Sequence, residues 1–333
     1  MPNRLTIFQI PEKLTPMQPT HSDPKLDKLG VAGSNPASPT DSQPCFTLSE
    51  VEHPCALPGL HSVRLGESIH AYHSDANYDN KSGLGLFGKS PVLYYEQVIA
   101  QTHTAVGSDA IQYGSLVHLL LELGEEEFYR RAVVAPDSFV TASGAISTKA
   151  DALKWRASLP ADAIPVSPAD MAMLKRQLAQ VKANSAARTL FEMPGWSEVS
   201  IRWMRQDGSK LRCRADKITR DGQIVDWKTT RDEQPLKTWW NAARQYDYFL
   251  QNALYEEGGR FAGLPDLPMV FVLLSTTTFQ CHVVTLPRQL VARAACRLDT
   301  LLGELRMCRE MESFLPEDYG QITELFVPPH VFA

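Results

Sequence analysis

The sequence predicts an α/β domain in which a central mixed β-sheet is flanked by helices, and three observations lead to this prediction. Helical apolar periodicity dominates the first part of the packed region, three consecutive strand patterns follow, and then come a helix, two more strands and a final long helix. This order is typical of a sheet covered by helices. The chain has 333 residues, of which 44% are apolar and 21% charged, so it can bury a sizeable core.

Residues 1–62 differ in composition from the rest of the chain. They are rich in Pro, Ser, Thr, Asn and Asp and show no sustained apolar period, so we expect a disordered or irregular N-terminal arm. Residues 63–333 show no second break and no internal repeat. They predict one packed domain.

Composition and charge narrow the class of protein. The net charge is −5, so contact with nucleic acid would require a local basic patch or metal ions. The six cysteines lack the spacing of a zinc site. No stretch reaches the roughly 20 apolar residues that span a membrane, and the N-terminus lacks the apolar core of a signal peptide. We therefore expect a cytoplasmic protein with reduced thiols and no membrane contact.

Capping and proline signals predict where the first helices begin. Asn80 or Ser82 can cap one helix, and Pro91 starts a second helical stretch. An apolar segment that begins at residue 108 predicts a helix buried on most sides, which carries His118 inward or near the wall of a cleft. A further helix is predicted over residues 168–184.

The second half of the chain alternates between strand and helix patterns. Three strands are predicted first, then one helix over residues 235–259 that ends at a glycine pair, then two strands and a last helix over residues 288–311. The predicted strands cover residues 197–204, 210–218, 223–230, 269–277 and 279–286.

Two registers are open for the hairpin that joins the second and third strands. A three-residue loop with Gly222 at positive φ sets Asp216 opposite Asp226, on one face with Lys228. A two-residue Asp-Gly turn would set Lys217 opposite Asp226 instead. We favour the first register because it gathers the polar side chains into one cluster.

Asp216, Asp226 and Lys228 would together suit metal-assisted hydrolysis of a phosphodiester. Two carboxylates a few ångströms apart repel each other unless a cation lies between them. Oxygen ligands suit Mg²⁺ or Mn²⁺, and a nearby lysine can position water or stabilise charge on a phosphate oxygen. The D-x-K triplet alone is common, since residues 23–25 and 79–81 also match it. The apolar strand, the hairpin and the upstream Asp216 distinguish residues 226–228 from both.

The stretch that contains these residues also resembles a known protein family. The stretch RADKITRDGQIVDWKTT is similar to the core of the PD-(D/E)xK nuclease superfamily. Three further stretches resemble motifs of its RecE-like, exodeoxyribonuclease VIII-type branch: YHSDANYDNKSGLGLFGKSPVLYY, YGSLVH and YDYFLQNALY. Asn80 departs from the pattern, because that branch usually has a serine there. The resemblance covers about residues 68–330 and implies a restriction-endonuclease-like core.

The resemblance implies roles for individual residues. His118, Asp216 and Asp226 would bind the metal, and Lys228 would orient the attacking water. Glu198 would be a further catalytic residue, either as a ligand or beside one. The supporting or DNA-contacting residues would be Gln251, Tyr255, Lys81 and Ser82. Ordinary packing remains an alternative for Gln251 and Tyr255.

Two smaller expectations concern charges and cysteines. Five basic residues could form a local phosphate-binding surface or simply be solvated: Lys81, Lys89, Arg202, Arg212 and Arg214. Some relatives in the superfamily hold an iron–sulfur cluster through one upstream and three closely spaced C-terminal cysteines. Cys281, Cys296 and Cys308 are too far apart for that arrangement, so we expect no iron–sulfur cluster.

The function that the resemblance implies is a Mg²⁺-dependent exonuclease, in which Mn²⁺ would substitute, acting on linear double-stranded DNA in recombination or repair. It further implies 5′-to-3′ polarity, a ring-shaped homo-oligomer around DNA ends and a partner protein that anneals single strands. Two alternatives stay open: an endonuclease of the same fold in phage or defence DNA processing, and a catalytically idle DNA-end-binding protein.

Overall fold

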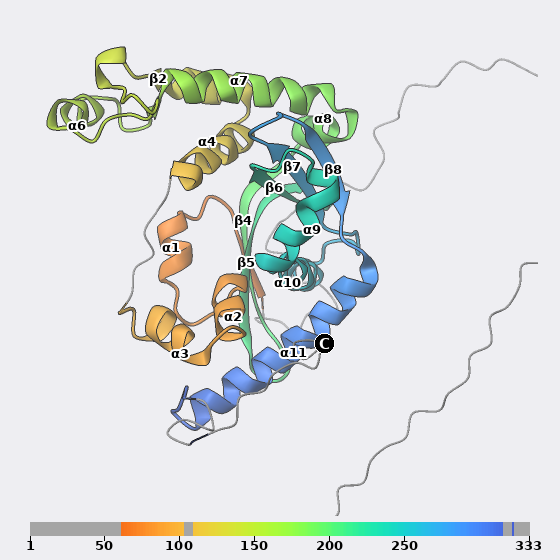
Figure 1. The fold of residues 1–333 in the computed structure, drawn as a ribbon. Helices are drawn as coiled ribbons and strands as arrows, with labels where there is room; N and C mark the ends of the chain where they lie inside the picture. Colours follow the sequence, from red (N-terminus) through yellow and green to blue (C-terminus); the bar gives the residue numbers. More distant parts are fainter. Residues whose placement is uncertain (1–60, 103–108, 316–321, 323–333) are drawn as a thin grey trace, which may run out of the picture. The chain divides into compact units, whose positions relative to one another are not determined.

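A computed structural model describes residues 61–102, 109–315 and 322, and its main feature is a six-stranded mixed sheet (Figure 1). The strand order is β1-β4-β5-β6-β7-β8; β6 and β7 run parallel, and all other neighbours are antiparallel. The strands are β1 (His61–Arg64), β4 (Gly195–Met204), β5 (Lys210–Thr219), β6 (Ile224–Thr230), β7 (Val270–Ser275) and β8 (Cys281–Thr285). The predicted fold class and the five predicted strands are confirmed.

Three strands were not predicted because they are very short. β1 adds to the edge of the main sheet beside β4, and it includes residues 61 and 62 of the region expected to be irregular. β2 (Ala132–Val134) and β3 (Ile164–Val166) form a separate parallel pair. The rest of the expected N-terminal arm, residues 1–60, lies outside the described residues.

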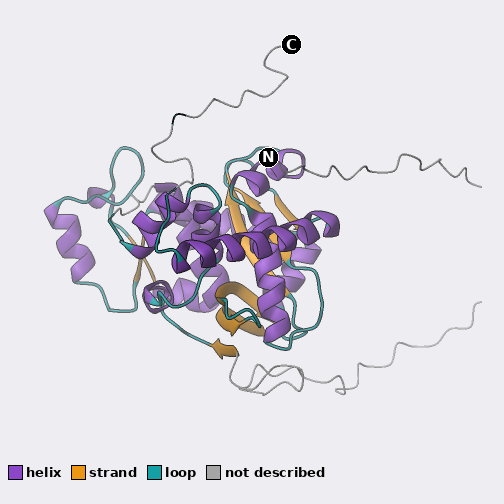
Figure 2. Cartoon of the chain, turned by 90° about the horizontal axis from the view of Figure 1, so that it is seen from below, coloured by secondary structure: helices purple, strands orange, loops and turns teal. Residues whose placement is uncertain are grey.

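Helices cover both faces of the sheet (Figures 1 and 2). The helices are α1 (Ile69–Ser74), α2 (Lys81–Phe87), α3 (Pro91–Tyr94), α4 (Asp109–Leu123), α5 (Glu125–Arg131), α6 (Ala150–Ala157), α7 (Pro168–Ala183), α8 (Ser185–Glu192), α9 (Pro235–Gln245), α10 (Tyr248–Phe261) and α11 (Arg288–Glu310). One core cluster joins the sheet to α2, α10 and α11, and the other joins it to α4, α7 and α8. Among the described residues, no helix combines the length and apolarity that a membrane crossing requires.

The predicted helix starts agree with the caps in the structure. The Asn80 side chain accepts the Gly83 N–H at 2.9 Å and so caps α2, which carries Lys81 and Ser82 in its first turn. Pro91 is the first residue of α3, and the Ser167 hydroxyl caps α7.

The single helix predicted over residues 235–259 is wrong, because the structure has two. α9 ends at Gln245, and Asp247 adopts a left-handed conformation with φ of 56° before α10 begins. The glycine pair lies inside α10 rather than at its end. A Cβ added to Gly258 would lie 2.8 Å from the Trp203 ring, so glycine there allows close packing against the sheet instead of ending the helix.

The hairpin between β5 and β6 has the three-residue loop. Lys217 pairs with Val225, Ile218 pairs with Ile224, and Gly222 has φ of +86°. This register sets Asp216 opposite Asp226, as predicted. The backbone ladder stops one pair before these two residues, and the Asp216 carboxylate accepts the Trp227 N–H at 2.8 Å instead.

The backbone is also distorted on the other side of Asp216. Glu198 lies in the gap of the β4–β5 ladder, between the pairs Ser197–Lys217 and Val199–Ala215, and its φ is +52°. A side chain other than glycine rarely adopts that conformation, and its cost is typically about 1–3 kcal/mol. The strands therefore separate from regular pairing on both sides of one aspartate.

Candidate active site

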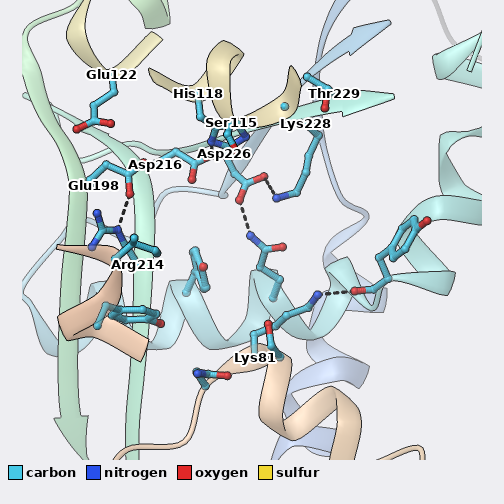
Figure 3. Close-up of a pocket in the computed structure, with 18 of the residues that line it drawn as sticks. Lys81, Ser115, His118, Glu122, Glu198, Arg214, Asp216, Asp226, Lys228 and Thr229 are labelled. Atoms are coloured by element: carbon cyan, nitrogen blue, oxygen red, sulfur yellow. Dashed lines mark hydrogen bonds and ion pairs between the residues drawn. The ribbon is translucent and has the colours of Figure 1, made fainter. Parts of the chain in front are cut away.

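All nine residues predicted for the site line one cavity of about 1090 Å³ (Figure 3). They come from α2, α4, three neighbouring strands and α10, and thus from segments far apart in the sequence. The nine are Lys81, Ser82, His118, Glu198, Asp216, Asp226, Lys228, Gln251 and Tyr255.

Three of these residues form a group that suits a cation. His118 Nδ1 lies 3.5 Å from Asp216 Oδ2, and His118, Glu198 and Asp216 each offer a ligand atom within 4.8 Å of the other two. One imidazole nitrogen and two carboxylates are donors that divalent ions accept. Burial, with His118 opposing it and the nearby Asp226 carboxylate adding to it, raises the pKa of Asp216 to about 6. A cation at this group would remove that penalty.

Asp226 lies outside this group of ligand atoms. Its side chain is buried, with 2% exposed; Gln251 Nε2 donates a hydrogen bond to Oδ1, and Lys228 Nζ lies 2.6 Å from Oδ2. Burial alone would lower the pKa of Lys228, but the charges of Asp226 and Asp216 outweigh it and raise that pKa. The lysine is therefore protonated and held against Asp226, beside the group of ligand atoms.

Glu198 is held by a basic residue on the neighbouring strand. Its carboxylate pairs with Arg214 Nε, and Arg214 also donates to the Glu67 carbonyl oxygen. The guanidinium thus links the segment before α1 to a residue of the cation-binding group. This contact explains how Glu198 is kept in its strained backbone conformation.

The remaining predicted residues surround the acidic cluster. Lys81 Nζ donates to the Tyr246 carbonyl oxygen at 2.5 Å, and burial together with the charge of Lys228 lowers its pKa to about 8. Ser82 lines the same cavity. Tyr255 lies one turn after Gln251 on α10, and burial raises the pKa of its hydroxyl.

Several residues that line the cavity were not predicted for the site, and Glu122 and Tyr248 are two of them. Glu122 lies one turn after His118 on α4, so helical spacing could have revealed it; burial and the Glu198 charge raise its pKa. Tyr248 lies between two lysines, with its ring centroid 5.4 Å from Lys81 Nζ and 5.0 Å from Lys228 Nζ. Its neighbours are distant in sequence, so no local signal marks it.

Neither interpretation offered for Arg202 and Arg212 holds. Both side chains are buried rather than solvated or available to phosphate. Arg202 forms ion pairs of 2.8 Å with Glu67 and with Asp75, and Arg212 donates to the carbonyl oxygens of Tyr72 and Asp75. They fasten α1 and its flanks to the sheet, and α1 forms part of the cavity wall.

The chain matches the model of a known protein family. Residues 82–323 match the model of a family described as a PDDEXK-like domain of unknown function (DUF3799). The chain belongs to this PDDEXK-like family. The membership confirms the PD-(D/E)xK fold inferred from the hairpin. No curated protein matches the sequence.

A solved structure agrees with the PDDEXK-like fold. The chain is similar to a protein from Eubacterium rectale described as a "putative exonuclease", with a TM-score of 0.52 and 13% sequence identity. The match covers 81% of this chain and 98% of that one. At this identity the likeness concerns the fold.

Proposed function

We propose that this PDDEXK-like chain is a metal-dependent DNA exonuclease that hydrolyses phosphodiester bonds of linear double-stranded DNA. One observation carries the proposal: the donor atoms of His118, Glu198 and Asp216 meet beside the Asp226–Lys228 pair in one cavity. A protein with a purely structural role does not require two further carboxylates, those of Asp226 and Glu198, placed where their charges raise the pKa of Asp216.

The cation-binding residues in this proposal are His118, Asp216 and Asp226, with Glu198 as a further ligand or neighbour. The donor atoms of His118, Asp216 and Glu198 already meet, whereas Asp226 lies beside them against Lys228 and would bind from that side. We propose Mg²⁺ as the ion and Mn²⁺ as its substitute, since both accept oxygen-rich sites. When bound, the ion makes water more acidic and offsets the charge that builds on a phosphate oxygen.

The protein's own groups would position the reactants. Lys228 is held by Asp226 within the cavity, and its protonated ammonium would orient the attacking water or stabilise charge on the phosphate. Gln251 would fix the rotation of the Asp226 carboxylate through its hydrogen bond. Lys81 and Ser82, from the first turn of α2, would contact DNA, with Tyr255 supporting the site.

The finer parts of the proposal rest on the resemblance to RecE-like enzymes. They are 5′-to-3′ polarity, a role in recombination or repair, a ring-shaped homo-oligomer that holds a DNA end, and an annealing partner for the single strand left behind. A cytoplasmic location, where such DNA ends occur, belongs to the same proposal.

The test compares linear, nicked and closed-circular duplex DNA as substrates for the wild type, Asp226→Ala and the control Asp151→Ala. Asp151 lies on α6 with its side chain 83% exposed. We expect only the linear duplex to be degraded, in Mg²⁺ or Mn²⁺ but not in EDTA, and the cleavage rate of Asp226→Ala to fall at least ~10²-fold. Cleavage of closed circles would indicate an endonuclease, and binding without cleavage would indicate an idle end-binding protein.

A further inference from the structure

A second cavity, of about 220 Å³, adjoins the candidate active site where the parallel strands β6 and β7 end. Crevices beyond the carboxyl ends of parallel strands commonly hold ligands. Thr229, which directly follows Lys228, lines both cavities. The polar residues that line the second cavity are Tyr113, Asp170, Thr229, Thr230, Arg231 and Thr276.

Tyr113 lines this cavity, and its hydroxyl group is buried. The residue is only 9% exposed, and its hydroxyl has no hydrogen-bond partner among the described residues. Leaving such a group unpaired costs about 1–3 kcal/mol, so a buried hydroxyl is normally bonded. Burial, with the Asp170 charge adding to it, raises the pKa of Tyr113, so the hydroxyl keeps its proton. A ligand with acceptor oxygens would satisfy it.

Arg231 brings a positive charge to the mouth of the same cavity. Its side chain is exposed and forms no ion pair with any residue in the described ranges. A guanidinium can donate two parallel hydrogen bonds to a phosphate. The Thr230 hydroxyl accepts the Asp232 N–H at 3.1 Å, which leaves its own proton available as a further donor.

Asp170 is the one acidic residue in the lining, and its charge is partly offset. Its carboxylate accepts the Ser167 hydroxyl at 2.8 Å in the first turn of α7. The dipole of that helix favours a negative charge there. The donors of Tyr113 and Arg231 therefore remain the groups that would select a ligand.

The distance between the two cavities fits a nucleic acid strand. Thr230 lies two residues beyond Lys228, which corresponds to about 7 Å along a β-strand. Successive nucleotides of one DNA strand advance about 3.4 Å along the duplex axis. A phosphate in the second cavity would thus lie about one or two nucleotides from a phosphate beside Lys228.

We propose that this cavity binds a non-reacting phosphate of the cleaved DNA strand, held by the Tyr113 hydroxyl and the Arg231 guanidinium. The proposal rests on the proposed nuclease function and names a subsite for its substrate. Holding a neighbouring phosphate fixes the register of the strand, so that one particular phosphodiester meets the cation-binding group. Tyr113 and Arg231 are then positioning residues, without part in bond cleavage.

The test replaces single phosphates of a linear duplex with neutral methylphosphonates, one position at a time. Single-turnover cleavage is measured for the wild type, Tyr113→Phe, Arg231→Gln and the control Arg293→Gln, an exposed arginine on α11. For the wild type and the control, we expect a methylphosphonate one or two nucleotides from the cleaved bond to lower the cleavage rate about tenfold. Arg231→Gln already lacks the contact, so the methylphosphonate at that position should lower its cleavage rate by less than about twofold.

Two further readouts separate a DNA contact from a structural role. Tyr113→Phe removes an unpaired hydroxyl, so its stability to urea should equal or exceed that of the wild type while its DNA affinity falls. Arg231→Gln should lower the slope of log affinity against log salt by about 1. If a methylphosphonate lowers the cleavage rate of the wild type and of Arg231→Gln equally at every position, the subsite proposal is refuted.

The same experiment distinguishes failure of the subsite from failure of the nuclease proposal. A wild type that cleaves unmodified duplex but shows no coupling between Arg231 and any phosphate refutes the subsite alone. If the wild type does not cleave, the scan is repeated as DNA affinity in Ca²⁺, where coupling would support the subsite without the nuclease. Absence of DNA binding refutes both.

Discussion

The Asp216 carboxyl should make the metal-free protein less stable as pH rises. Burial is the largest cause that moves its pKa from 3.8 to about 6 on folding, with the Asp226 charge adding to the shift. Between these two values the unfolded chain loses this proton while the folded chain keeps it, so unfolding becomes easier as pH rises. At 1.36 kcal/mol per pKa unit, the full penalty is about 3 kcal/mol above pH 6.

Asp216→Asn removes this titration and keeps an oxygen that can accept the Trp227 N–H. In EDTA, we expect the free energy of unfolding of the variant to rise relative to that of the wild type by up to about 3 kcal/mol between pH 4 and pH 7. Urea unfolding at half-unit pH steps measures the difference, and the other titrating groups largely cancel in it. Asp151→Asn, at an exposed position, serves as the control and should show no such trend.

A difference between Asp216→Asn and the wild type that does not change with pH would refute this reasoning. So would a wild type that gains stability relative to the variant as pH rises. The same argument predicts that Mg²⁺ raises the stability of the wild type more at pH 7 than at pH 5, because the ion binds the ionised carboxylate. The Asn variant should lose most of that stabilisation.

Three further predictions concern a buried lysine and two helix glycines. Burial lowers the pKa of Lys217 to about 8. Lys217→Met should therefore be more stable than the wild type at pH 7, by an amount that is reduced by the loss of the hydrogen bond to the Phe191 carbonyl oxygen. Urea unfolding should show this advantage disappearing between pH 8 and 10.5, because the folded wild type loses the lysine proton there before the unfolded chain does. Gly258→Ala should cost about 1–3 kcal/mol, because the new Cβ meets the Trp203 ring at 2.8 Å. Gly303→Ala, in α11 with nothing within 4 Å, should instead raise Tm by removing a helix-interior glycine worth about 1 kcal/mol.

The sequence by itself determined the sheet strands near the site and the register of the central hairpin. Strand patterns have a period of two, and Gly222 satisfies the positive φ of a three-residue loop, so Asp216 and Asp226 could be set opposite each other without other information. The starts of the helices that Asn80 and Ser167 cap could also be predicted, because the bonds that define a cap span only three residues.

Tertiary structure decided what local pattern could not. The glycine pair in α10 imitates a helix end, yet Gly258 is there because Trp203, 55 residues earlier, presses against it. Glu198 takes its strained conformation beside Arg214 from the next strand, and Arg202 is buried because Glu67 and Asp75 reach it from a distant segment. Local propensity carries no information on such contacts.

The site residues could be predicted from the sequence, but their contacts could not. Spacing and resemblance named nine residues, and all of them line one cavity, because a motif records which side chains a strand or helix presents. Their partners depend on how those elements pack: Lys228 faces Asp226 rather than the His118 group, and Tyr248 lies between two lysines. The second cavity was unforeseen because it exists only where α4 and α7 meet the ends of β6 and β7.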